Sequence, residues 1–223
     1  MKVAAILLAR TLAFVETADI NPRGQVFFPD LTNELVKRYN FQVFPQTPDQ
    51  FDQQKGVVFR AGRFNDKTIE SFTIFDSLLV LETRSNTSDS KEIIEEMLEW
   101  GNKTFGLNYE PKMIRHWAYV SDITFHSDFP LLAAANTSLS RLAQKTSEAV
   151  STIWRERVDY EPNSLAINHD PLKRLTGIAA LTISYRANVP FSENKYFSEA
   201  PLPTDQHIKL LKEFEEDVRN SAS

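Results

Sequence analysis

The chain has 223 residues but contains no cysteine and only six glycines. Without cysteine it forms no disulfide, has no thiolate nucleophile and cannot build cysteine-ligated zinc or iron–sulfur sites. This absence fits a reducing compartment, so we expect a cytoplasmic protein. So few glycines cannot supply the loops that cradle phosphates, which argues against P-loop and dinucleotide-binding proteins. The Gly-x-Ser-x-Gly elbow of serine hydrolases is also missing.

Apolar runs long enough to span a membrane are missing as well. The most apolar segment, near the N-terminus, is interrupted by Arg10 and Glu16 and has no small-x-small cleavage pattern. It is too short to cross a bilayer, so we interpret it as a buried strand rather than a signal peptide and expect no membrane partner. The net charge of −5, with a pI near 5.5, argues against a general nucleic-acid binder. It does not exclude a local basic groove, because net charge averages over all faces of the protein.

The composition is that of a folded globular protein. Hydrophobic residues make up 42% of the chain and charged residues 25%. A body of this size buries about 70% of the surface of its unfolded chain, so it needs no crosslinks for stability. We therefore expect one compact domain over residues 1–223.

The first half of the chain alternates strand and helix patterns. Hydrophobic periodicity and turn residues predict a strand over 3–15, a helix from Pro29, a short strand over 41–44, strands over 56–61, 68–75 and 78–83, and a helix ending at Gly106. Asp89 followed by Glu92 has the spacing of a capping box, so we expect Asp89 to cap the last of these helices.

The second half repeats this order with different residues. The same criteria predict a strand over 113–125, one helix over 131–154 or two joined near Asn136, strands over 160–168 and 177–185, an irregular segment over 190–203 and a helix over 204–218. We expect an α+β fold in which an antiparallel sheet carries helices packed on one face. Residues 1–108 and 111–223 are then two structural halves. They either arose by duplication of a strand–helix–strands–helix unit or are alike because few arrangements bury such elements.

The end of the second long strand carries the best candidate for a catalytic site. Alternation along a strand places Asp122, His126 and Asp128 on one face. A histidine between carboxylates can bind a metal or act as an oriented base. The plainer interpretation is that this face is turned to solvent at the strand end, because the apolar residues between them take the other face.

The segment from Arg186 to Pro203 has the composition of a binding loop. Long irregular loops in compact domains are commonly lids, binding loops or interface arms. Its aromatic residues are suited to anchor a partner and its polar residues to form a rim; the candidate binding residues are Arg186, Phe191, Glu193, Asn194, Lys195, Tyr196 and Phe197. The alternative is that these aromatic side chains fold back and cap the sheet.

These patterns favour a protein-binding or assembly module without intrinsic catalysis, acting through its sheet face and residues 186–203. We expect a protein partner or self-association, no cofactor and no metal. The main alternative is a metal- or acid/base-dependent hydrolase, nuclease-like, that uses Asp122, His126 and Asp128. A nucleic-acid adaptor is a third alternative, and it requires the basic residues to gather on one face.

Overall fold

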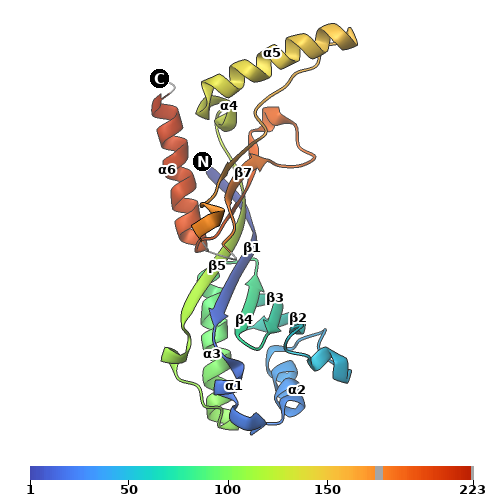
Figure 1. Cartoon of the computed structure of the whole chain (residues 1–223), viewed down its shortest axis with the longest axis vertical. Helices are drawn as coiled ribbons and strands as arrows, with labels where there is room; N and C mark the ends of the chain where they lie inside the picture. Colours follow the sequence, from blue (N-terminus) through green and yellow to red (C-terminus); the bar gives the residue numbers. More distant parts are fainter. Residues whose placement is uncertain (174–177, 222–223) are drawn as a thin grey trace. The chain divides into compact units, whose positions relative to one another are not determined.

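A computed structural model describes residues 1–173 and 178–221 of the chain (Figure 1). Within these residues the strands form an antiparallel sheet of eight strands, accompanied by six α-helices. The predicted α+β class is therefore confirmed. None of the helices in these two ranges combines the length and hydrophobicity that a membrane span requires.

The sheet is built mainly from hairpins. The strands are β1 Lys2–Phe14, β2 Val57–Phe64, β3 Lys67–Ile74, β4 Leu78–Thr83, β5 His116–His126, β6 Ser164–Ile167, β7 Leu181–Tyr185 and β8 Lys195–Ala200. Their order in the sheet is β2-β3-β4-β1-β5-β8-β7-β6. Strands β4, β3 and β2 thus follow β1 in the same way as β8, β7 and β6 follow β5. A common origin of the two halves is not established by this order and stays a prediction.

Helix ends follow ordinary capping rules. The α-helices are α1 Thr17–Ile20, α2 Phe28–Tyr39, α3 Thr87–Phe105, α4 Leu131–Ala135, α5 Thr137–Trp154 and α6 Thr204–Ser221; the 3-10 turns are η1 Pro22–Gly24, η2 Pro48–Phe51, η3 Pro111–Met113, η4 Pro171–Lys173 and η5 Phe191–Glu193. α2 has a proline in its first turn and ends at Asn40, which adopts a left-handed conformation. α3 ends at the left-handed Gly106, as predicted.

The chain divides into two compact units, which we describe separately. Unit 1 comprises Met1–Ala5, Asp122–Pro201 and Asp205–Ser223, and unit 2 comprises Ile6–Ser121 and Leu202–Thr204. Both β1 and β5 contribute residues to each unit. The prediction that residues 1–223 fold as one compact domain stays a prediction.

The core of unit 2 lies between its strands and the helices α2 and α3. Burial alternates along β4, where Leu79 and Leu81 are buried and the residues beside them are half-buried. Ile94 and Met97 of α3 pack into the same core, together with the fully buried Tyr39 of α2. Alternate burial of this kind is typical of strands covered by helices on one face.

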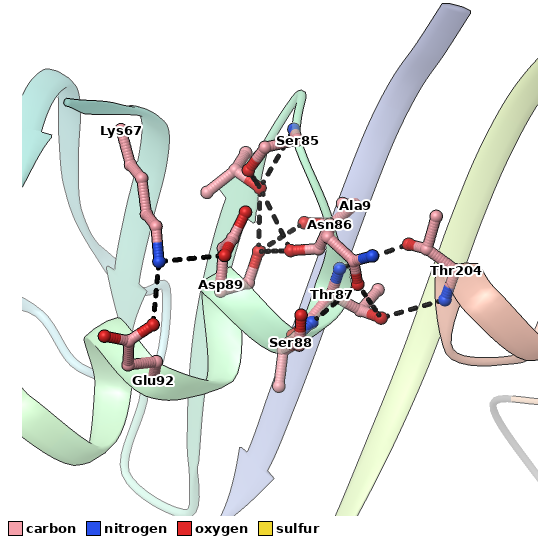
Figure 2. A network of polar contacts seen from close by, with 12 residues as sticks. Ala9, Lys67, Ser85, Asn86, Thr87, Ser88, Asp89, Glu92 and Thr204 are labelled. Atoms are coloured by element: carbon pink, nitrogen blue, oxygen red, sulfur yellow. Dashed lines mark hydrogen bonds and ion pairs between the residues drawn. The ribbon is translucent and has the colours of Figure 1, made fainter.

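Polar contacts within unit 2 fix the start of α3 (Figure 2). Ser90 Oγ donates to the carbonyl of Ala9 at 2.7 Å, and Thr11 Oγ1 donates to the carbonyl of Thr87 at 3.0 Å. Thr87 and Thr204 exchange two hydrogen bonds, because the backbone N–H of each donates to the hydroxyl of the other. All of these residues are buried, so the bonds satisfy polar groups that water does not reach.

The predicted cap of α3 at Asp89 is wrong. The helix begins at Thr87, and its N-cap is Asn86, whose side-chain oxygen accepts a hydrogen bond from the Ser88 N–H at 3.0 Å. Asp89 instead forms an ion pair with Lys67 of β3 at 2.8 Å (Figure 2). Asparagine and aspartate are equally good caps, so spacing alone does not choose between them.

The core of unit 1 is formed by β5, β7 and β8 with α4 and α6. Alternate residues of β8 are buried, beginning with Tyr196. Its ring packs in one cluster with Phe125 of β5, Leu131 of α4 and Leu211 of α6. The predicted irregular segment over 190–203 is therefore wrong over 195–200, where the chain is a strand hydrogen-bonded to β7.

Two further element predictions have clear outcomes. The break near Asn136 is confirmed, because this residue ends α4 and caps α5, its side chain accepting a backbone hydrogen bond at 3.0 Å. The short strand over 41–44 is wrong, because only Val43 pairs, as an isolated bridge to β2. The predicted strand over 177–185 is confirmed over 181–185 as β7, whereas residues 178–180 are not in a strand and Gly177 lies outside the described residues.

Candidate functional site

The predicted catalytic residues do not assemble into a metal site. Asp122 and His126 lie on β5, which ends at His126. Asp128 lies beyond the strand, is exposed, and has its carboxylate 3.6 Å from the guanidinium of Arg219. Across the described parts of the chain, no group of three or more His, Asp or Glu side chains is arranged to hold a metal ion. The hydrolase alternative stays a prediction, and the geometry of these residues lends it no support.

The candidate binding residues of 186–203 lie around β8. Arg186 follows β7, Phe191 and Glu193 lie in η5, Asn194 follows η5, and Lys195, Tyr196 and Phe197 begin β8. Tyr196 is fully buried, and its hydroxyl accepts a hydrogen bond from the Leu131 N–H at 3.0 Å. Lys195 and Phe197 are half-buried on the opposite face of the strand. Tyr196 thus belongs to the core of unit 1 and is not available to a partner.

The aromatic rings of this segment stack on the sheet. The centroid of Tyr185 lies 4.2 Å from that of Phe191 and 4.8 Å from that of Tyr196. Burial and the contact with Tyr196 raise the pKa of the Tyr185 hydroxyl. The guanidinium of Arg186 lies 6.0 Å from the ring centroid of Phe197. These contacts agree with the alternative given for this segment, in which its aromatic side chains fold back and cap the sheet.

A buried serine–histidine pair in unit 1 is not apparent from the sequence. Ser198 of β8 and His207 of α6 are both fully buried, and Oγ lies 2.8 Å from Nε2. The serine Oγ also donates to the carbonyl of Thr182 at 2.6 Å. A hydroxyl has one proton, so His207 donates to Ser198 and does not accept a proton from it. This arrangement is the reverse of an activated serine nucleophile, and it connects α6 to β8.

The largest group of exposed apolar side chains in the described residues lies on α5 and just after it. Five of the twelve large hydrophobic residues that are exposed fall there: Leu139, Leu142, Ile153, Trp154 and Tyr160. None of the 18 residues of α5 is buried. In Figure 1, α5 extends away from the strands of unit 1. An amphipathic helix normally buries its apolar stripe, so this one lacks a cover.

The sequence makes α5 a helix with two distinct sides. Apolar residues lie along one side at helical spacing, with Thr146 between Leu142 and Ala149, and we call them the α5 face: Leu139, Leu142, Ala149, Val150 and Ile153. Asn136 caps the first turn, and Arg155, in the left-handed conformation, ends the last one. Thr146 lies in the middle of the α5 face, and its hydroxyl donates to the carbonyl of Leu142 at 2.9 Å. The middle of the face is therefore formed by small side chains.

The segment after α5 returns along one flank of the helix. The N–H of Val158 donates to Ser151 Oγ at 2.9 Å, and the N–H of Tyr160 donates to Ser147 Oγ at 2.8 Å. Between this segment and the helix lies a groove of about 330 Å³, whose lining includes Leu139, Leu142, Ala143, Tyr160 and Pro162. The returning segment thus widens the apolar surface at one end of the α5 face and leaves most of that face uncovered.

Charge contributes little to this surface. The polar side of α5 carries Arg141, Lys145 and Glu148, a net charge of +1. Gln144 Nε2 donates to Glu148 Oε1 at 3.2 Å. Within the described residues neither Arg141 nor Lys145 forms an ion pair. The distinguishing property of this surface is its apolar area.

Comparison with known proteins gives no assignment. No protein-family model matches the chain, and no curated protein is significantly similar to it.

Proposed function

We propose that the chain is a protein-binding or assembly module whose main contact surface is the α5 face. The observation that carries the proposal is exposure: Leu142 is 60%, Ile153 76% and Trp154 73% exposed in one helix. Large exposed apolar patches mark interaction sites in soluble proteins, whereas single exposed apolar residues do not. The lack of cysteine supports a cytoplasmic location for this module.

Burial of the α5 face is the driving force of the proposed association. Covering a Leu or Ile side chain fully contributes on the order of 1.5–3 kcal/mol. Three or four such side chains, with a tryptophan beside them, form the apolar centre that protein interfaces contain. Because the polar side of α5 carries a net charge of only +1, binding should depend weakly on salt.

The α5 face supports this function better than residues 186–203 do. Tyr196 lies in the core, and Phe191 stacks on Tyr185. Within 186–203, Phe191 is the one large apolar side chain that is exposed, at 37%. The α5 face offers several exposed apolar side chains along one continuous helix.

The test compares two substitutions that add the same charge to opposite sides of α5. Leu142→Asp places a carboxylate in the α5 face, and Gln144→Asp places one on the polar side. We expect the wild type and Gln144→Asp to associate with copies of themselves or with a captured protein, and Leu142→Asp to lose that association. Sedimentation velocity and affinity capture measure it. A wild-type monomer that captures no protein, or a Leu142→Asp variant that binds like the wild type, contradicts the proposal.

A loss of binding must not reflect unfolding. Leu142 is largely exposed, so its replacement should change the free energy of unfolding by less than about 0.5 kcal/mol. Thermal unfolding of both variants checks this directly.

A further inference from the structure

Unit 2 contains an apolar cavity at the ends of its two longest helices. Its volume is about 80 Å³, and it is partly open. Leucine side chains from α2, β4 and α3 line it, including Leu31, Leu35, Leu79 and Leu98. An engineered cavity of about 150 Å³ in another protein holds a benzene ring, so 80 Å³ is room for roughly three or four carbon atoms. That is the size of a branched aliphatic side chain.

The cavity adjoins a larger surface groove. The groove has a volume of about 760 Å³ and is lined by residues of α1, η1, the start of α2 and η2. Four residues line both spaces: Thr17, Asn21, Phe28 and Gln53. A ligand that lies in the groove can therefore extend one of its groups into the cavity. The exposed ring of Phe27 stands at the rim and adds apolar surface there.

The polar residues at the mouth are held in place by the fold. Thr17 Oγ1 donates to the carbonyl of Asp76 at 2.9 Å. The side-chain amide of Asn21 both donates to and accepts from the backbone of Val26, at 2.8 and 2.9 Å. The side-chain amide of Gln53 lies 3.4 Å from the Thr17 hydroxyl, whose one proton is given to Asp76, so at least one of the two N–H groups of the amide has no acceptor within the described residues. The mouth therefore offers a donor suited to a ligand carbonyl.

The charges of the groove balance one another. Asp52 is paired with Lys55 at 3.1 Å. The remaining charged residues in the lining are Arg23 and Asp76, one of each sign. A groove without net charge favours a neutral ligand over a free carboxylate or an amine. A peptide backbone is neutral and supplies the carbonyl groups that Gln53 can bind.

From these features we propose that unit 2 binds an extended peptide segment by inserting one branched aliphatic side chain, such as leucine, into the cavity. The peptide backbone lies in the groove, with a carbonyl accepting from Gln53 Nε2. Phe27 covers the neighbouring peptide residue. This site is separate from the α5 face and does not rest on the function proposed for that face.

The experiment is a titration monitored by the methyl NMR signals of the full chain, with N-acetyl-leucine amide as the probe. We expect shifts at the methyl groups of Leu31, Leu79 and Leu98. N-acetyl-alanine amide, which lacks three carbon atoms, should bind about fifty-fold more weakly. Gln53→Met should weaken binding of the leucine probe roughly tenfold, because it keeps the size of the side chain and removes the amide donor.

A cavity-filling variant provides the control for folding. Leu98→Phe adds a ring where Leu98 now lines the cavity, so we expect unchanged or higher thermal stability and at least about tenfold weaker binding. The proposal is overturned if N-acetyl-leucine amide shifts none of these methyl signals at its solubility limit. It is also overturned if Leu98→Phe folds and binds as well as the wild type, or if hexanoate, a free carboxylate, binds more tightly than the leucine probe.

Discussion

Thr87 and Thr204 cap each other across 117 residues of sequence. The Thr87 N–H donates to Thr204 Oγ1 at 3.1 Å, and the Thr204 N–H donates to Thr87 Oγ1 at 2.9 Å. Both residues are buried and stand at the first position of a helix, α3 and α6 respectively. Each hydroxyl satisfies a backbone donor that lacks an intrahelical partner.

Replacing either threonine with valine should therefore destabilise the fold. Valine keeps the shape but leaves one buried N–H without an acceptor, so we expect a loss of about 1–3 kcal/mol in the free energy of unfolding for Thr87→Val or Thr204→Val. Denaturant unfolding measures the loss. Thr152→Val on the exposed side of α5 is the control and should cost less than about 0.5 kcal/mol. Equal effects at all three positions would show that the reciprocal bonds are unimportant.

The ion pair of Lys67 and Asp89 should make stability depend on pH (Figure 2). Burial alone raises the pKa of Asp89, but hydrogen bonds from Lys67 and Ser85 outweigh it, so the pKa lies below the ordinary 3.8. A lowered carboxyl pKa stabilises the fold above the ordinary value, and this stabilisation is lost as pH falls through the folded-state value.

We therefore expect the stability difference between wild type and Asp89→Asn to shrink as pH falls from about 5 to about 3. Thermal unfolding across this range measures it. Asp66→Asn, in the exposed turn after β2, is the control and should show no such trend. A difference that stays constant down to pH 3 would count against the role given to Asp89.

Gly62 in β2 leaves space for the ring of Phe41. A Cβ at position 62 would overlap that buried ring, so Gly62→Ala should cost about 1–3 kcal/mol by overpacking. The cost should fall in a Phe41→Leu background, where the ring is gone. A double-mutant cycle measures the coupling, and strictly additive effects would contradict this explanation.

Ser198 should not behave as a nucleophile. Its hydroxyl donates to the carbonyl of Thr182 and accepts from His207, and the whole group is buried. We expect no modification of Ser198 by a fluorophosphonate probe, and we expect Ser198→Ala to destabilise the protein by about 1–3 kcal/mol. Mass spectrometry and thermal unfolding check the two results. Stoichiometric labelling of Ser198 would contradict the structural role given to this serine.

Local sequence patterns predicted the elements that bury a strong apolar stripe. The periodicity of α3 and the apolar-rich run of β1 are signals of this kind, and both elements lie close to their predicted bounds. β8 was not predicted from the sequence. Its buried residues after Tyr196 are serine and alanine, which are weak strand signals, and its pairing with β7 depends on a separate segment of the chain.

The candidate surfaces depended on information that a sequence does not carry. The apolar spacing of α5 is that of an ordinary core-facing helix, and only the fold shows that its stripe is uncovered. The pairing of Ser198 with His207 and the cavity in unit 2 likewise depend on how separate elements pack. Exposure, unlike periodicity, is a property of the whole fold.

The most direct test of the central claim uses the absence of cysteine. Single cysteines introduced as Thr146→Cys, in the middle of the α5 face, and Gln144→Cys, on its polar side, report solvent access through their rates of maleimide labelling. Light scattering monitors the association. We predict that association slows maleimide labelling at position 146 at least about tenfold and leaves the labelling rate at position 144 unchanged. Equal labelling rates at both positions in the associated protein would contradict the assignment of the α5 face as the contact surface.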